Sequence, residues 1–208
     1  MLIGLITKPT NKLMKRLSIY LFLILFTLQT PSWADDISDF EIEGIHIGDS
    51  ALDYISEEII KKNTFDYYND KTFTPVQNDH LSFFKIYDAI DFQYKTDDKN
   101  YIIHGLSGVI IYENNIKDCY KKMDEIVSVL SKIFKNEATQ AKKITEPFYE
   151  IDKSGESKVT VVDFWFDSTE DRASVTCYDY SEKIESQDHL NVSLMTKEFN
   201  EFLLNDAY

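Results

Sequence analysis

The sequence predicts an α+β domain over residues 35–208: a mostly antiparallel sheet, two main helices packed on one face, and a short C-terminal helix. Two stretches, 50–62 and 115–135, carry apolar residues at the three- and four-residue spacing of an amphipathic helix. Several other stretches alternate apolar and polar residues as strands do, and short polar turns separate them. Consecutive strands joined by short turns pair in antiparallel fashion.

The first half of the domain is expected to contain three strands and two helices. Ser50 and Asp53 form a capping-box pattern at the start of the first helix. Gly105 and Gly108 indicate a bulge within the third strand. The expected elements are a strand at 40–47, a helix at 50–62, a loop at 63–81, strands near 83–95 and 101–113, and a helix at 115–135.

The second half is expected to consist of strands followed by one helix. Thr196 stands before an apolar pattern of Phe199, Phe202 and Leu203 and is expected to cap that helix. The expected elements are a strand ending near 151, a turn at 152–158, strands at 159–166 and 172–180, a loop at 181–189, a strand at 190–195, and the final helix.

Residues 1–34 have the pattern of a secretion signal. Four positively charged residues precede an apolar run of twelve residues, Leu17–Leu28. Small residues follow at Ser32 and Ala34. An uncleaved membrane anchor is the alternative, but a spanning helix needs about 20 apolar residues. We therefore expect cleavage after residue 34 and a periplasmic or secreted location, with Met1 or Met14 as the start.

The domain that would remain is strongly acidic. Residues 35–208 carry 18 Lys and Arg against 36 Asp and Glu, because all four charges removed with residues 1–34 are positive, and the difference is −18. This charge repels nucleic acid and anionic lipid, so neither nucleic-acid binding nor membrane insertion of this domain is expected. It favours a cationic protein or small-molecule partner, although solubility alone also explains it.

The two cysteines are expected to form a disulfide. Cys119 falls on the apolar face of the helix at 115–135, and Cys177 shares a strand face with Ala173 and Val175. A helix face and a strand face that meet across a core suit a disulfide, and exported proteins reside where disulfides persist. The alternative is a redox pair or metal site, but the sequence has no Cys-x-x-Cys motif.

The sequence lacks the common catalytic motifs, namely the zinc-protease, nucleophile-elbow, Walker and dinucleotide patterns. None of the four histidines is paired with another at ligand spacing, and no cofactor or catalytic residue is predicted. A catalytic site assembled from distant residues remains an alternative.

Acidic residues cluster around one turn and make it the first candidate for a cation site. Calcium binds several oxygens of this kind, although turns also favour Asp for backbone reasons and a solvated hairpin tip is the alternative. The candidate ligands are Asp163, Asp167, Glu170 and Asp171.

A run of aromatic residues in the expected loop is the candidate binding surface. Phe65, Tyr67 and Tyr68 stand beside Asn69 and Asp70. Exposed rings next to amides and carboxylates can stack on a sugar and hydrogen-bond to it, or anchor a protein partner. The alternative is that these rings hold the loop against the core.

Three segments resemble a family of small exported bacterial proteins that has no assigned biochemical function. They are FEIEGIHIGDSALDY (40–54), the stretch 91–127 that contains DCYKK, and VSLMTKEFNEFL (192–203). The resemblance implies an α+β domain and a strand partner for the helix cysteine. It implies no catalytic or binding residues.

The sequence thus favours an exported, non-catalytic binding or interaction domain. A hydrolase-like enzyme with a distributed site and a calcium-binding protein are the alternatives. A histidine, a carboxylate and a hydroxyl within hydrogen-bond reach in one pocket would favour the enzyme.

Overall fold

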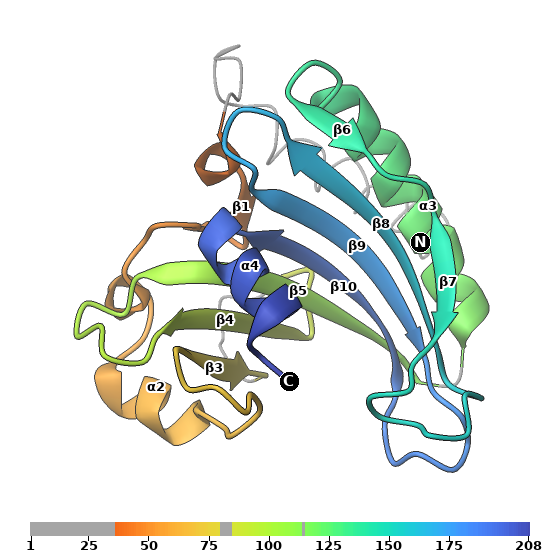
Figure 1. Cartoon of the computed structure of the whole chain (residues 1–208), viewed down its shortest axis with the longest axis horizontal. Coiled ribbons are helices and arrows are strands. Elements are labelled where there is room, and N and C mark those ends of the chain that lie inside the picture. The colour runs from red at the N-terminus through yellow and green to blue at the C-terminus, as the bar shows by residue number, and fades with distance from the viewer. Residues whose placement is uncertain (1–35, 80–84, 114) are drawn as a thin grey trace, which may run out of the picture. The chain divides into compact units, whose positions relative to one another are not determined.

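The computed structural model describes residues 36–79, 85–113 and 115–208 (Figure 1). The chain divides into two units, 1–33 and 34–208. The predicted signal segment lies outside the described residues. The second unit confirms the predicted α+β class, because its described part contains three α-helices and an antiparallel sheet of eight strands.

The sheet joins the two halves of the domain through its central strands. The last strand in the sequence lies between the fifth and the ninth, so hairpins from both halves meet there. All neighbouring strands are antiparallel. In spatial order the strands are β3 (Phe73–Asn78), β4 (Ala89–Lys95), β5 (Ile103–Glu113), β10 (Asp188–Met195), β9 (Arg172–Asp179), β8 (Lys158–Phe166) and β6 (Ala138–Gln140), while β7 (Ile144–Pro147) also pairs with β8.

Two helices lie on one face of this sheet, which we call the α3 face and which carries Val162, Cys177 and Leu190. The long helix α3 (Ile116–Ile133) contacts β9, β10 and β5, and buries an apolar stripe that includes Cys119 and Met123. The short helix α2 (Glu57–Asn63) is tied to the same side, because Asn63 donates to the Asn78 side chain at 2.6 Å.

The C-terminal helix α4 (Lys197–Asn205) packs on the opposite face, the α4 face (Figure 1). The predicted cap is confirmed, because the Thr196 hydroxyl accepts from the Phe199 amide at 3.2 Å. Phe199 and Phe202 are buried, and a Cβ on Gly105 would lie 2.6 Å from the Phe199 ring. Glycine at this position therefore allows the helix to approach β5 closely. The apolar cluster beneath the helix consists of Tyr68, Phe73, Met195, Phe199, Phe202 and Ala207.

The N-terminal elements differ from the prediction in two places. The expected strand at 40–47 is a small hairpin of β1 (Glu41–Ile42) and β2 (Ile45–His46), which turns at Glu43 and Gly44 with positive φ values of 54° and 82°. The expected helix at 50–62 is interrupted: a 3-10 turn at Ala51–Asp53 follows Ser50, and α2 begins after Ser56. The Ser56 hydroxyl accepts from the Ile59 amide and starts the second helix anew.

The expected loop at 63–81 contains the edge strand β3. This strand contains Pro75, although proline cannot donate to a ladder. At the outermost position of the sheet the loss is small, and the Pro75 carbonyl still accepts from the Phe65 amide at 3.3 Å. Strand β6 was also not predicted, since it has three residues.

Candidate functional site

The predicted disulfide is present. Cys119 on α3 and Cys177 on β9 are bonded, with their Cα atoms 6.1 Å apart. Both side chains are fully buried. The bond therefore fixes the long helix to the middle of the sheet and plays no part in a surface site.

The three predicted binding aromatics gather around one pocket. Phe65 and Tyr67 are 42% and 45% exposed, and their ring centroids lie 5.9 Å apart. The pocket has a volume of about 340 Å³, within the range of roughly 300–1,000 Å³ that is typical of small-molecule sites. We call it the aromatic pocket; it is lined by Thr64, Phe65, Asp66, Tyr67, Tyr68, Lys71, Phe73, Thr74 and Pro75.

Tyr68 has a different environment from the other two aromatics. Its ring is only 6% exposed and packs edge-on against Phe202, with ring centroids 5.1 Å apart. Burial raises the pKa of its hydroxyl. Tyr68 thus forms the back wall of the pocket and also holds the loop against α4, whereas Phe65 and Tyr67 present their rings to solvent.

The polar groups of the aromatic pocket are already partly paired. The Lys71 ammonium donates to the Asp66 carboxylate and to the Tyr68 carbonyl. The hydroxyl of Thr74 is within 2.7 Å of the Thr96 hydroxyl. The pocket therefore combines exposed aromatic rings, an ion pair between Lys71 and Asp66, and a hydroxyl group. Such groups can stack on a ligand and form hydrogen bonds with it.

The structure does not bring the four predicted cation ligands together. Asp163 lies within β8 and faces Arg172, whereas Glu170 pairs with Lys197 at 2.9 Å. The Asp171 carboxylate accepts from the Lys197 amide at 2.6 Å and Asp167 accepts from a threonine hydroxyl. Among the described residues no group of three or more His, Cys, Asp or Glu could hold a metal ion.

His104 makes the contacts that come nearest to a catalytic arrangement. Its Nδ1 atom lies 3.4 Å from the Thr196 hydroxyl and 3.8 Å from the Glu198 carboxylate. A catalytic histidine uses one ring nitrogen for the nucleophile and the other for the acid, whereas here the same nitrogen faces both. Burial lowers the pKa of His104, and the Thr196 hydroxyl already caps α4. This arrangement supports the helix start rather than catalysis.

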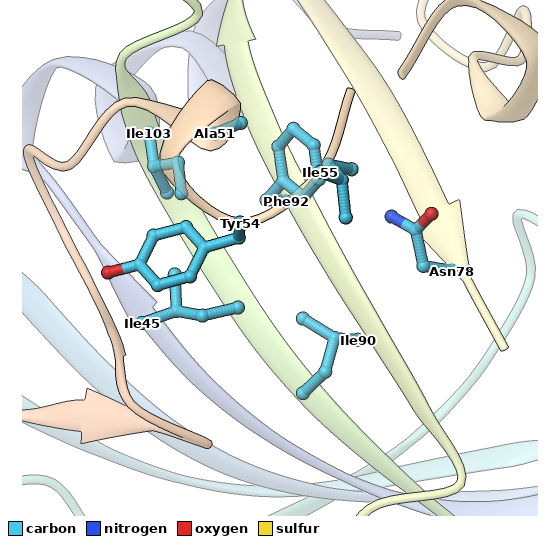
Figure 2. A pocket seen from close by; sticks show the side chains of 8 residues that line it. All are labelled: Ile45, Ala51, Tyr54, Ile55, Asn78, Ile90, Phe92 and Ile103. Atoms are coloured by element: carbon cyan, nitrogen blue, oxygen red, sulfur yellow. The ribbon is translucent and has the colours of Figure 1, made fainter. Parts of the chain in front are cut away.

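A second pocket lies under the α3 face and is too small for a ligand (Figure 2). Its volume is about 10 Å³, which is near the space of one water molecule. Figure 2 shows aliphatic and aromatic side chains around it, with Asn78 at its rim. The Nδ2 atom of Asn78 is buried and without a hydrogen-bond partner among the described residues.

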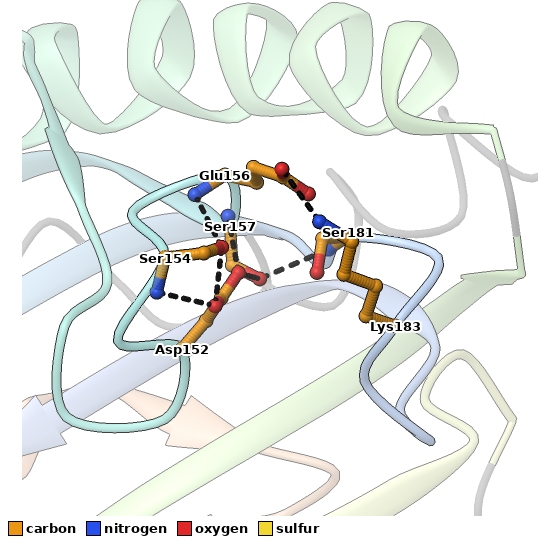
Figure 3. Close-up of polar contacts among 6 residues, drawn as sticks. All are labelled: Asp152, Ser154, Glu156, Ser157, Ser181 and Lys183. Carbon is orange, nitrogen blue, oxygen red and sulfur yellow. Dashed lines mark hydrogen bonds and ion pairs between the residues drawn. The ribbon is translucent and has the colours of Figure 1, made fainter.

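Asp152 organises a loop rather than a site (Figure 3). Its carboxylate accepts from the amides and hydroxyls of Ser154 and Ser157 at 2.6–2.9 Å. These hydrogen bonds hold the pKa of Asp152 well below its ordinary value, and the bond from the Ser154 hydroxyl contributes most. The Ser157 hydroxyl also accepts from the Ser181 amide, and Lys183 pairs with Glu156 at 2.7 Å. The network joins the two loops at one end of the sheet.

No family model, curated protein or solved structure matches this chain at a significant level. The resemblance to the exported family therefore stays a prediction, and the geometry alone carries the functional argument. No helix among residues 36–79, 85–113 and 115–208 has the length and apolar character needed to cross a membrane.

Sequence reasoning missed a row of polar side chains across the α4 face. Strand register places five residues side by side on neighbouring strands, and we call them the serine row: Asp91, Ser107, Ser193, Ser174 and Asp163. The Ser107 hydroxyl donates to the Ser193 hydroxyl at 3.0 Å, and the latter donates to the Asn191 side chain at 2.7 Å. Each strand showed its own alternation, but only the pairing register reveals that these residues are neighbours.

A group of stacked rings occupies the same face near one end of the sheet. The ring centroids of Tyr178 and His189 lie 4.6 Å apart at an interplanar angle of 24°, and Tyr180 stacks on both. Phe148 packs against the two tyrosines. We call Phe148, Tyr178, Tyr180 and His189 the aromatic stack. Its members are strand and loop residues from three separate segments.

Proposed function

We propose that residues 35–208 form an exported, non-catalytic binding domain that holds a small ligand in the aromatic pocket. The observation that carries the proposal is the convergence of Phe65 and Tyr67, both exposed, on one pocket of ligand size. Exposed rings with adjacent hydrogen-bonding groups are the arrangement that stacks on the flat face of a sugar ring. A saccharide is the ligand class that fits this chemistry best.

Export is supported by the segment 1–34 and by the disulfide. The Cys119–Cys177 bond is compatible with an oxidising compartment outside the cytosol, where such bonds persist. The positive charges, the apolar run and the small residues before Asp35 support the assignment of a secretion signal. A binding role is favoured over catalysis because the His104 contacts use one ring nitrogen for two purposes.

The aromatic pocket can be tested by removing its two exposed rings together. The double variant Phe65→Ala with Tyr67→Ala is expected to weaken saccharide binding at least tenfold, because stacking on a sugar depends on the area of the aromatic rings. Isothermal titration of the domain with a panel of mono- and disaccharides measures the affinity. The double variant should retain nearly the stability of the parent, since both side chains are half exposed.

Leu204→Ala is the matched control, because Leu204 is 67% exposed on α4 and does not line the pocket. This variant should bind as the parent does. Equal affinity of the parent and the double variant for the same saccharide would contradict the pocket assignment. A panel without any saturable heat would contradict the ligand class, and native mass spectrometry of the exported protein would then identify what it carries.

A further inference from the structure

Asp91 is the acidic residue of the α4 face for which the fold supplies no positive charge. Its Oδ1 atom is buried and has no hydrogen-bond partner among the described residues. None of the described lysines or arginines forms an ion pair with it. Asp163 at the other end of the serine row also has a buried Oδ1 atom without a hydrogen-bond partner among the described residues, but it faces Arg172, whose Nε lies 4.0 Å from that atom.

Burial of the charged Asp91 carboxylate is unfavourable, and no ion pair among the described residues offsets it. Burial raises the pKa of Asp91 to about 6, and a hydrogen bond from Gln77 opposes the rise only in part. Acids that are shielded from water and lack a charge partner cluster at functional sites, which makes Asp91 a candidate for one. A cation that also donates hydrogen bonds would complement this carboxylate in both charge and hydrogen bonding.

The surroundings of Asp91 supply the remaining contacts for such a group. Ser107 lies opposite Asp91 on the neighbouring strand, and its hydroxyl is linked to Ser193. Ser193 follows Ser107 in the same row on the next strand.

We propose that Asp91 is the charge partner of a small primary amine, which also contacts Ser107 and Ser193 on the α4 face. A primary ammonium group donates three hydrogen bonds, and the acceptors here are the Asp91 carboxylate and the hydroxyl oxygens of Ser107 and Ser193, which have two lone pairs each. A quaternary ammonium ion has no such donors, so the amine is preferred. The site goes beyond the aromatic pocket, because Asp91, Ser107 and Ser193 do not line that pocket.

The net charge of the domain favours the same ligand class. With −18 over residues 35–208, the field attracts cations from solution before any specific contact forms. That field is nonspecific, so an experiment must separate it from a contact with Asp91. Asp163 offers this separation, because it carries the same charge and lies on the same row four strand spacings away, about 19 Å along the sheet.

Isothermal titration of the domain with putrescine at 0.15 M salt, roughly physiological ionic strength, tests the proposal. We expect saturable binding of putrescine, at least tenfold weaker binding of tetramethylammonium, and no binding of the neutral 1,4-butanediol. Asp91→Asn should weaken putrescine binding at least tenfold, whereas Asp163→Asn should change it less than threefold. Ser193→Ala, which removes a hydroxyl of the row, should weaken it severalfold.

Three results would overturn the proposal. They are no saturable heat with putrescine, spermidine or tyramine; equal affinity of the parent and Asp91→Asn; and an equal loss in the Asp91 and Asp163 variants, which would show the general field alone. Misfolding does not confound the outcome, because Asp91→Asn relieves a buried charge and its circular dichroism is expected to match the parent. Parent-like putrescine binding by the Phe65 and Tyr67 double variant would show that the amine site is separate from the aromatic pocket.

Discussion

At the scale of single residues, Asp91 makes the stability of the fold depend on pH. Its pKa is raised from 3.8 to about 6 because burial disfavours the charged carboxylate. The folded state therefore binds this proton more tightly than the unfolded state does. The resulting stabilisation is fully present below pH 3.8, falls as the pH rises through 6, and is absent at neutral pH.

Asp91→Asn is expected to raise the free energy of unfolding at pH 7.5 by about 1–2 kcal/mol. The shift of roughly two pKa units sets an upper bound of about 3 kcal/mol, and the amide must still be accommodated. At pH 4 the two proteins should differ by less than about 0.5 kcal/mol, since Asp91 is then protonated in the folded parent. Urea titrations at both pH values measure the difference. A variant less stable than the parent at pH 7.5 would contradict the buried-charge argument.

At the scale of elements, local sequence signals predicted most of the structure. The patterns at 115–135, 159–166 and 172–180 each correspond to an observed helix or strand, because amphipathic spacing reflects which face is buried. The Thr196 cap was predicted for the same local reason. Prediction failed for β3, where an edge position tolerates Pro75, and for β1 and β2, where a turn at Glu43–Gly44 divides one apparent strand.

The candidate sites were predictable only in part, for a related physical reason. Phe65, Tyr67 and Tyr68 were accessible to sequence reasoning because they are adjacent in the chain and form one pocket. The serine row consists of single residues from five strands, and its existence depends on register and strand order. Neither quantity is set by local periodicity, so no signal in the sequence pointed to Asp91.

Helix α4 depends on the absence of a side chain at Gly105. A methyl group there would lie 2.6 Å from the Phe199 ring and 2.3 Å from the Gln93 amide oxygen, so the helix or the strand must move. We expect Gly105→Ala to lower the free energy of unfolding by about 1–3 kcal/mol, as overpacking does elsewhere. Ser107→Ala, on the same strand and face, adds no volume and should cost at most about 1 kcal/mol. Chemical denaturation measures both, and equal stability of Gly105→Ala and the parent would contradict close packing of α4.

At the scale of the whole molecule, the disulfide and the export proposal support one another. The Cys119–Cys177 bond closes a loop across a sequence separation of 58 and joins α3 to β9. The buried residues of α3 around Cys119 form part of the core between this helix and the sheet. In the chain-entropy model, closing such a loop lowers the entropy of the unfolded chain and thereby stabilises the fold by about 4 kcal/mol. Such a bond persists where thiols are oxidised, which is compatible with the export that residues 1–34 predict.

The thiol state of the protein from its natural compartment tests this relation. We expect mass spectrometry of the exported protein to show a chain that begins near Asp35, and a thiol assay after denaturation to find no free cysteine. Replacing both cysteines by serine should lower the free energy of unfolding by about 4 kcal/mol, because the unfolded chain regains its freedom. Single replacements should cost as much, since either one prevents the bond. Two free thiols in a chain that still carries Met1 or Met14 would contradict both the location and the role of the bond.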